Sequence, residues 1–284
     1  KVVRRSEELA QLAPDNPEYM PLLGPQEYVQ TNTWSQTTSQ VTPEHRADKA
    51  SASINASKEN GLVVAGFMDD NESFVAMMNN KGLFAYNLST GVNFTATIRS
   101  EDGTGSGWVT RDYNDVSKLD TVEASNIAIG KCLGSREAKE MEPGRYTVIL
   151  EPAASVGLLA NMAGAMNQRA ADEGRSFMSK KPAEGEELPE GAPLNRVGEK
   201  IFGDQVTVYS DPAYPEAPTA PFAGDGHAVG RTLWIDKGVV KTLPNSRYWA
   251  QKTGVPYVPT AFAGGGLFGG GVQLIMDGGD KSLE

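Results

Sequence analysis

Very few residues of this chain have side chains that bind transition metals or act as strong nucleophiles. Two histidines, His45 and His227, and one cysteine, Cys132, are spread widely along its 284 residues. A catalytic zinc takes three protein ligands from His, Cys, Asp and Glu and keeps one position open for water. Because no two of these three residues are close in sequence, their spacing indicates no local zinc motif.

The polar turn Asp225–His227 is the place where a histidine has an acidic neighbour. A carboxylate two residues away can make an imidazole a stronger base. No second histidine or cysteine is in local reach, so we predict a loop or surface histidine rather than a ligand or base. His45, in the first turn of an expected helix, is predicted to face solvent. Cys132 is predicted to be a buried structural thiol, because no base is nearby.

Two other segments have compositions that could support chemistry. Ser176 has a hydroxyl that could act as a nucleophile, but nothing like a Gly-x-Ser-x-Gly elbow surrounds it. The glycines of Glu101–Trp108 could cradle an anion, but the strand-to-helix context of a phosphate loop is missing. We therefore expect no acyl-transfer triad, and a tight loop beneath Trp108.

The length of the chain gives room for two domains. Hydrophobic residues make up 39% and charged residues 22% of it, which suits a globular protein that buries a core. No run approaches the ~18 apolar residues of a membrane-spanning helix. The start of the chain has no apolar signal-peptide core. With a single cysteine, these features favour a reducing compartment, so we expect a cytoplasmic protein with no membrane association.

The charge balance bears on the class of partner. A formal net charge of −10 opposes direct nucleic-acid binding, because such binding depends on cationic side chains that neutralise phosphates. Lysines and arginines are scattered, with no basic stripe between aromatic residues. We expect no direct nucleic-acid contact.

The first half of the chain is predicted to fold as helices followed by an antiparallel meander. Residues 1–12 have helical spacing, 14–25 are proline-rich and extended, and the helix at 42–59 opens with a capping threonine and a proline. Short β-branched and aromatic runs then alternate with turn formers. These predict strands at 62–68, 73–78, 82–86 and 93–98, turns at 69–71 and 79–82, and a helix over 120–139.

The second half is predicted to open with a strand at 146–150 that leads into a helix at about 155–170. Residues 179–193 are rich in proline, glycine and charge, which indicates an exposed loop. The other expected elements are a strand at 205–209, a hairpin with a glycine turn over 231–243, and a short helix at 246–252.

Together these patterns predict an α+β fold, with two β-rich domains, mainly antiparallel sheets and a few covering helices. Residues 1–140 form a central domain with the meander, and residues 141–284 form a C-terminal domain with the helix at about 155–170. Strands are expected to dominate 61–100 and 205–243.

The strand-to-helix stretch, Met141–Leu150 followed by Val156–Ala165, resembles the TldD/PmbA family, whose members are described as metallopeptidase-like and as modulators of DNA gyrase. In the catalytic branch of that family, a Leu-Leu pair precedes a His-Glu-x-x-x-His zinc motif. The resemblance puts those motif positions on Ala160, Asn161 and Ala165. Alanine has no side-chain lone pairs, and asparagine cannot act as a general base. The chain therefore resembles the PmbA/TldE branch, which lacks the zinc motif.

The resemblance continues along the chain in a fixed order, and residues 1–140 match more loosely. One departure is at Ala223–Gly224, where family members commonly have an acid pair, so only Asp225 remains. Family members also extend past both ends, so the resemblance implies an internal fragment of a longer protein, with residues 1–12 as the end of a longer helix. The matching segments are 174–177, 197–200, 206–212, 221–226, 235–241 and 246–250.

By resemblance, the chain is expected to be the non-catalytic partner subunit of a zinc metallopeptidase complex that acts on unfolded peptides or peptide precursors. The partner would be a TldD-like catalytic subunit that carries the zinc, or a second copy in a homodimer. No cofactor is expected in this chain. Such a subunit needs exposed strand edges or glycine-rich loops that bind peptide backbone. The candidate peptide-binding residues are Arg175, Ser176, Phe177, Gly264, Gly265 and Gly266.

Two other functions remain open. The chain could be an active metallopeptidase whose ligands come from elsewhere, or a peptide-binding or scaffold protein with no peptidase partner. Stoichiometric zinc in the isolated chain would favour the first of these. Copurification with a zinc-motif paralogue would favour the partner role, and neither observation would favour the scaffold.

Overall fold

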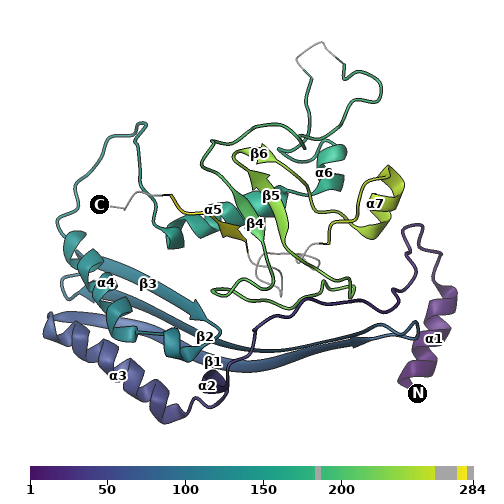
Figure 1. The fold of residues 1–284 in the computed structure, drawn as a ribbon. Helices are drawn as coiled ribbons and strands as arrows, with labels where there is room; N and C mark the ends of the chain where they lie inside the picture. Colours follow the sequence, from purple (N-terminus) through teal and green to yellow (C-terminus); the bar gives the residue numbers. More distant parts are fainter. Residues whose placement is uncertain (183–186, 260–273, 280–284) are drawn as a thin grey trace.

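Helices and strands are mixed along the chain, and both sheets are antiparallel. The computed structural model describes residues 1–182, 187–259 and 274–279. A three-stranded sheet has the order β1-β2-β3 and a four-stranded sheet the order β6-β5-β4-β7, which confirms the predicted α+β class (Figure 1). In chain order the elements are α1 (Val2–Leu12), α2 (Gln36–Ser39), α3 (Pro43–Glu59), β1 (Leu62–Met78), β2 (Phe84–Ser100), β3 (Ser106–Tyr113), a 3-10 turn (Val116–Lys118), α4 (Thr121–Gly134), α5 (Pro152–Ala165), α6 (Gln168–Asp172), β4 (Val208–Ser210), β5 (Thr232–Asp236), β6 (Val239–Val240), α7 (Arg247–Thr253) and β7 (Ile275–Met276).

The first sheet is built around a long ribbon formed by β1 and β2, each of 17 residues. They pair without interruption from Leu62↔Ser100 to Met78↔Phe84. The predicted meander of four short strands is therefore wrong, because Asp69–Asn71 lie inside β1, opposite Asn93–Gly91, instead of in a turn. Polar residues are tolerated there because that part of β1 remains partly or fully exposed.

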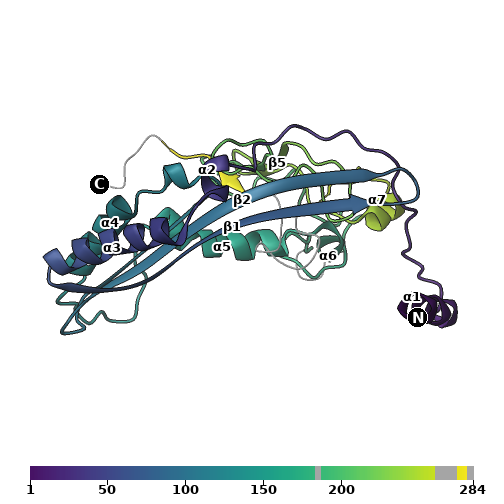
Figure 2. The same cartoon turned by 90° about the horizontal axis from the view of Figure 1, so that it is seen from below.

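The two ends of the ribbon bury opposite faces. Near the tip, where β1 turns into β2, Ala85 and Asn87 are buried, whereas further along β2 the buried residues are Phe94, Ala96 and Ile98. Successive side chains of a strand point to opposite faces, so the shift from odd to even positions marks a change of buried face. At the end away from the tip, α3 and α4 cover the sheet (Figures 1 and 2).

Local signals position these two helices as predicted. Thr42 caps α3 by accepting from the backbone nitrogen of His45 at 3.2 Å, and Pro43 occupies the first turn. Asp120 caps α4 by accepting from two backbone nitrogens, each at 3.0 Å. Cys132 is fully buried and free, as predicted.

The segment predicted as a loop beneath Trp108 is a turn followed by β3. Trp108 lies within β3 and is 45% exposed. Packing explains why a glycine occupies position 107, because a Cβ on Gly107 would collide with the backbone oxygen of Ala128 in α4. Gly107 therefore permits close packing of β3 on α4, and it pairs with Ile98 of β2.

After α1, residues 14–35 form an extended strap that runs along the ribbon (Figure 2). Thr33 makes two hydrogen bonds to β2. Its hydroxyl donates to the Leu88 oxygen at 2.7 Å, and its backbone oxygen accepts from the Thr90 nitrogen at 3.0 Å. The strap also contacts the second half of the chain. Tyr28 donates to the Gly226 oxygen at 2.7 Å, and Glu18 forms an ion pair with Arg169 at 2.9 Å.

In the second half, the predicted strand at 146–150 does not form. These residues are exposed and pair with no described strand, because a β-branched run becomes a strand only beside a partner. The predicted helix at 155–170 is interrupted after Ala165 and divided into α5 and α6. Residues 205–243 hold only the short strands β4, β5 and β6, so the expected dominance of strands there is wrong.

Two smaller predictions for this half are confirmed. β5 and β6 form the expected hairpin, and its turn has Lys237 and Gly238 with positive φ of 47° and 83°. α7 begins after Ser246, whose hydroxyl accepts from the Trp249 nitrogen at 3.1 Å. Within the described residues, no helix has the length and apolar character needed to cross a membrane. The division of the chain at residue 140 stays a prediction.

Candidate functional site at the end of helix α5

Helix α5 is fixed in place by methionines near its end and by the residue that caps its start. Met162 and Met166 pack against the second hydrophobic core, which includes Val208, Trp234 and Ile235. Glu151, at the N-cap, forms an ion pair with Lys131 of α4. Nearer the start of α5, Val156 and Leu158 remain 58% and 63% exposed.

The three motif positions lie in the last turns of this helix. Ala160 is buried, Ala165 is half-buried, and Asn161 is exposed. The Asn161 side chain donates to the Gly157 oxygen at 3.0 Å, one turn earlier. Residues five apart on a regular α-helix are separated by about 140° in azimuth, and α5 is helical through Ala165. Positions 160 and 165 therefore point in well-separated directions.

These residues do not fit a zinc ion. Two of the three side chains carry no donor atom, and an amide is a poor zinc ligand compared with imidazole, thiolate or carboxylate. Elsewhere among the residues that the structure describes, no group of three or more His, Cys, Asp and Glu side chains is close enough to hold a metal ion. No metal-dependent step can be derived from this set of side chains.

Ser176 binds the end of the same helix. Its hydroxyl donates to the Ala165 oxygen at 2.6 Å and accepts from the Met178 nitrogen at 3.1 Å. The structure thus brings together a motif position and a residue predicted to bind peptide. Both bonds of the Ser176 hydroxyl are to backbone atoms, with no imidazole beside it, so its geometry is that of a structural residue.

The other predicted peptide-binding residues lie in the same loop or outside the described part. Gly174 has φ of +77°, a left-handed conformation that favours glycine. Arg175 bonds to Glu173, with Nε at 3.2 Å from the carboxylate, and Phe177 is 44% exposed. Gly264, Gly265 and Gly266 lie outside the described residues.

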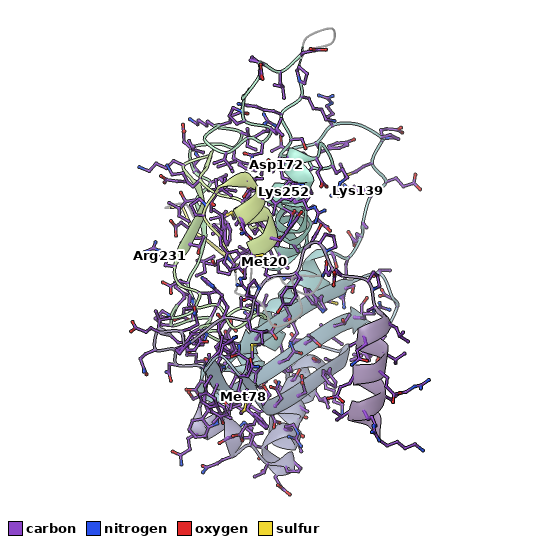
Figure 3. The ribbon with its side chains drawn as sticks, turned by 90° about the vertical axis from the view of Figure 1, so that its right-hand side faces the viewer. Met20, Met78, Lys139, Asp172, Arg231 and Lys252 are labelled. Atoms are coloured by element: carbon purple, nitrogen blue, oxygen red, sulfur yellow. The ribbon has the colours of Figure 1, made fainter. Side chains whose placement is uncertain are left out.

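Helix α6 connects this loop to α7 through a set of polar contacts. Trp249 of α7 donates from its indole nitrogen to Asp172 at 2.8 Å, and Asn195 donates to the same carboxylate at 2.7 Å. Arg169 lies over the Trp249 ring, 5.1 Å from its centroid. Figure 3 shows Asp172 and Lys252 at the same end of the molecule. Hydrogen bonds from Arg175 and then from Arg169 lower the pKa of the Glu173 carboxyl.

His227 belongs to a separate cluster at the joint between the two halves. Asp225 accepts from the His227 backbone nitrogen at 3.0 Å and from the Tyr257 hydroxyl at 3.1 Å. The Tyr257 ring meets His227 edge-on, with centroids 4.7 Å apart. Burial and then the charge of Asp225 raise the pKa of Tyr257. His227 lies in a loop as predicted, but it is half-buried, and its Nδ1 has no hydrogen-bond partner among the described residues.

The prediction that His45 faces solvent is wrong. His45 is half-buried, and its Nε2 is buried with no hydrogen-bond partner in the described part of the chain. The N-cap at Thr42 was visible in the sequence, but the direction of the imidazole depends on how α3 packs. His45, His227 and Cys132 remain in separate parts of the fold and form no joint site.

Comparison with known proteins identifies the family. The sequence profile described as "PmbA/TldA metallopeptidase C-terminal domain" matches residues 143–284, which is half of the chain. The chain belongs to the PmbA/TldD family. The chain is also similar to a protein named "Metalloprotease" from Methanothermobacter thermautotrophicus. The two are 22% identical over 192 residues, which cover 66% of this chain and 39% of that protein.

Solved structures of similar fold cover nearly the whole chain. TldE from Thermococcus kodakarensis has a TM-score of 0.76 at 17% identity, over 99% of this chain and 62% of that one. A Thermotoga maritima protein that carries the description of a DNA gyrase modulator has a TM-score of 0.79 at 20% identity, over 98% and 61%. This PmbA/TldD-family chain thus spans about three fifths of the length of these structures.

Sequence reasoning did not find several residues that shape the PmbA/TldD fold here. Tyr28 and Tyr257 meet the turn at Asp225 from opposite ends of the chain. Trp249 was placed on a short helix, but its bond to Asp172 was not foreseen. Tyrosine and tryptophan have a polar atom that seeks a partner when buried, and that was the only local signal.

Proposed function

We propose that this chain is the non-catalytic member of a PmbA/TldD-type peptidase complex and helps to hold extended peptide while a zinc-bearing partner cleaves it. The observation that supports this most directly is the chemistry of α5, where Ala160, Asn161 and Ala165 cannot form a catalytic zinc site. The fold of the family is otherwise retained around this helix.

Exposed apolar side chains on α5 and in the loop after Gly174 support peptide binding. Val156 and Leu158 are exposed apolar side chains in the first half of the helix, and Phe177 adds an exposed aromatic ring in the loop after Gly174. The bond from Ser176 to Ala165 fixes that loop against the helix. Extended peptides bind through backbone hydrogen bonds together with contacts to alternate side chains, so exposed apolar groups favour such ligands.

The proposed partner is a TldD-like subunit, and a homodimer is the alternative assembly. We place the complex in the cytoplasm, which the single, fully buried and free Cys132 supports. Peptide precursors and unfolded peptides are the proposed substrates. The acidic net charge supports a protein or peptide partner over nucleic acid.

The test is coexpression of this chain with a family paralogue that carries the His-Glu-x-x-x-His motif. We expect a stable complex that cleaves an unfolded peptide, with zinc found in the paralogue and not in this chain after the two are separated. The substitution Phe177→Ala should weaken peptide binding without dissociating the complex. Phe84→Ala, which removes an exposed phenylalanine from the ribbon, is the matched control.

An active metallopeptidase is the second candidate, because one relative bears the name "Metalloprotease". Stoichiometric zinc in the purified chain, together with cleavage in the absence of any paralogue, would establish this function and reject the partner role. A monomeric or homodimeric chain that binds peptide but neither holds zinc nor recruits a paralogue would instead be a binding or scaffold protein.

A further inference from the structure

A polar pocket lies where the first sheet meets the second half of the chain. It has a volume of about 720 Å³, including the part open to solvent. Residues from all three strands of the first sheet line one side, and Glu216, Ala217 and Pro218 line the other. None of the lining residues belongs to α5 or to the loop after Gly174, so this pocket is distinct from the site described above.

The lining is rich in hydrogen-bond acceptors and free of cationic side chains. Asp112 and Glu216 each bring a carboxylate, and Asn71, Asn93 and Asn114 bring amides. Both carboxylate residues are exposed, so a ligand can reach them from solvent. No lysine, arginine or histidine lines the pocket.

Two of the three amide side chains in the pocket already donate hydrogen bonds. Asn93 donates its Nδ2 to Asp112 at 2.7 Å, and Asn114 donates its Nδ2 to the Asn32 oxygen at 3.0 Å. The hydroxyl of Thr90 likewise donates to the Asn114 backbone oxygen at 2.8 Å. These bonds leave the amide side-chain oxygens as acceptors. The pocket therefore offers acceptors and negative charge and needs a ligand that supplies donors.

The two sides of the pocket are held in fixed positions. On the sheet side, Asn71 pairs with Gly91, and its side chain lies over that glycine so closely that a Cβ there would be 3.0 Å from Nδ2. On the other side, the Thr219 nitrogen donates to the Pro212 oxygen at 3.0 Å. Lys118 joins the two halves by donating to the Pro215 oxygen at 3.3 Å.

We propose that this pocket binds an alkylammonium group, supplied by a lysine side chain or by the free N-terminus of a peptide. An ammonium group has three N–H donors and no acceptor, which complements two carboxylates and the amide oxygens. A Ca²⁺ ion favours several carboxylates, whereas this pocket has two, and no group of three or more His, Cys, Asp and Glu side chains in the described residues could hold a metal ion. An anion would be repelled by Asp112 and Glu216.

The experiment titrates the full chain with three small probes and follows backbone amide chemical shifts by NMR. Nα-acetyl-lysine amide offers a side-chain ammonium, triglycine amide offers an N-terminal ammonium, and Nα-acetyl-norleucine amide offers neither. We expect saturable shifts at the pocket residues with one or both ammonium probes and none with the neutral probe. Which ammonium probe binds more tightly distinguishes the two sources.

Variants assign the binding to the pocket. Glu216→Gln and Asp112→Asn should each weaken ammonium binding roughly two- to fivefold, the range expected for one solvent-exposed ion pair. Glu101→Gln, which removes an exposed carboxylate from the turn before β3, is the matched control and should leave binding unchanged. If Asp112→Asn disrupts the fold, Glu216→Gln still tests the proposal, because Glu216 is an exposed loop residue.

Four outcomes would overturn the proposal: no saturable shifts with either ammonium probe, equal binding of the norleucine probe, equal weakening by Glu101→Gln, or tighter binding of CaCl₂ at the same residues. None of these outcomes depends on a peptidase partner or on α5. A failure here therefore leaves the proposed function of the chain untouched, and the converse also holds.

Discussion

The hydroxyl of Ser176 donates to the backbone oxygen of Ala165 across 2.6 Å, joining the loop after Gly174 to the last turn of α5. The final four carbonyls of a helix have no intrahelical partner, and this bond satisfies one of them. Two residues that the sequence associates with different functions, a degenerate metal position and a peptide contact, therefore form one structural unit. Ser176 acts as a helix-end partner in that unit.

Removal of this contact should destabilise the second half of the chain. Ser176→Ala deletes the bond to Ala165 and the acceptor for the Met178 nitrogen. Because Ser176 is half-buried, the unfolding free energy of the variant should be lower by about 1–2 kcal/mol. Urea denaturation followed by tryptophan fluorescence measures the loss. Ser51→Ala, at an exposed position of α3, is the control and should have a smaller effect. Equal midpoints for Ser176→Ala and the unmodified chain would show that the bond contributes nothing.

The degenerate helix should not be restored by replacing its side chains alone. The triple variant Ala160→His, Asn161→Glu and Ala165→His restores two ligand types and a base. We expect only weak zinc binding and no peptidase activity, because α5 is regular through Ala165 and the two introduced imidazoles would lie about 140° apart. Competition with a chromogenic zinc chelator gives the affinity. Tight zinc binding by the variant would mean that the helix distorts easily and would contradict this account.

Gly226 is packed so closely that even a methyl group should disturb the contact between the two halves. A Cβ there would be 2.7 Å from Leu83 Cδ1 and 3.0 Å from Met77 Sδ, at the tip of the ribbon. Gly226 also has φ of +86°. Gly174→Ala is a matched control, since its φ is +77° and nothing lies within 4 Å. Both variants lose about 1 kcal/mol from backbone strain, and Gly226→Ala should lose a further ~1–3 kcal/mol from overpacking.

Thermal or urea unfolding of both glycine variants decides the point. Equal losses would show that Leu83 and Met77 move aside without cost. A larger loss for Gly226→Ala, together with increased proteolysis of the strap at residues 14–35, would show that the turn at Asp225–His227 helps to fasten the halves together.

Asp115 should contribute to acid sensitivity. The Thr37 hydroxyl, at 2.6 Å, and then the Ser117 backbone nitrogen, at 3.0 Å, lower the pKa of Asp115 to about 2. In the unfolded chain the value is about 3.9. A lowered folded pKa gives stability that is fully present above the unfolded pKa and is lost as the pH falls from about 4 towards 2.

Stability measured from about pH 5 to about pH 2 should therefore fall less steeply for Asp115→Asn than for the unmodified chain. Asp48→Asn, at an exposed position of α3, removes the same charge and should leave the slope unchanged. If Asp115→Asn and Asp48→Asn gave identical slopes, the bonds from Thr37 and Ser117 would not be the source of the effect.

Elements whose signals lie within a few residues were predicted well. The Thr42 cap and Pro43 fix the start of α3, Ser246 starts α7, and the glycine turn at Gly238 makes the β5–β6 hairpin. These features depend on backbone groups that are adjacent in sequence. The strand at 146–150 failed for the opposite reason, because a strand exists only if another strand accepts its hydrogen bonds.

The sequence by itself determined what α5 can do chemically. The inability of Ala160, Asn161 and Ala165 to hold a catalytic zinc ion is a property of their functional groups and holds in any fold. Only the tertiary structure decided which distant groups come together: Ser176 bonds to Ala165, Tyr257 bonds to Asp225, and Asp112 and Glu216 line the same pocket. Such contacts depend on how sheets and loops pack across long stretches of chain. That packing follows from the summed burial of many side chains, and no short motif records it.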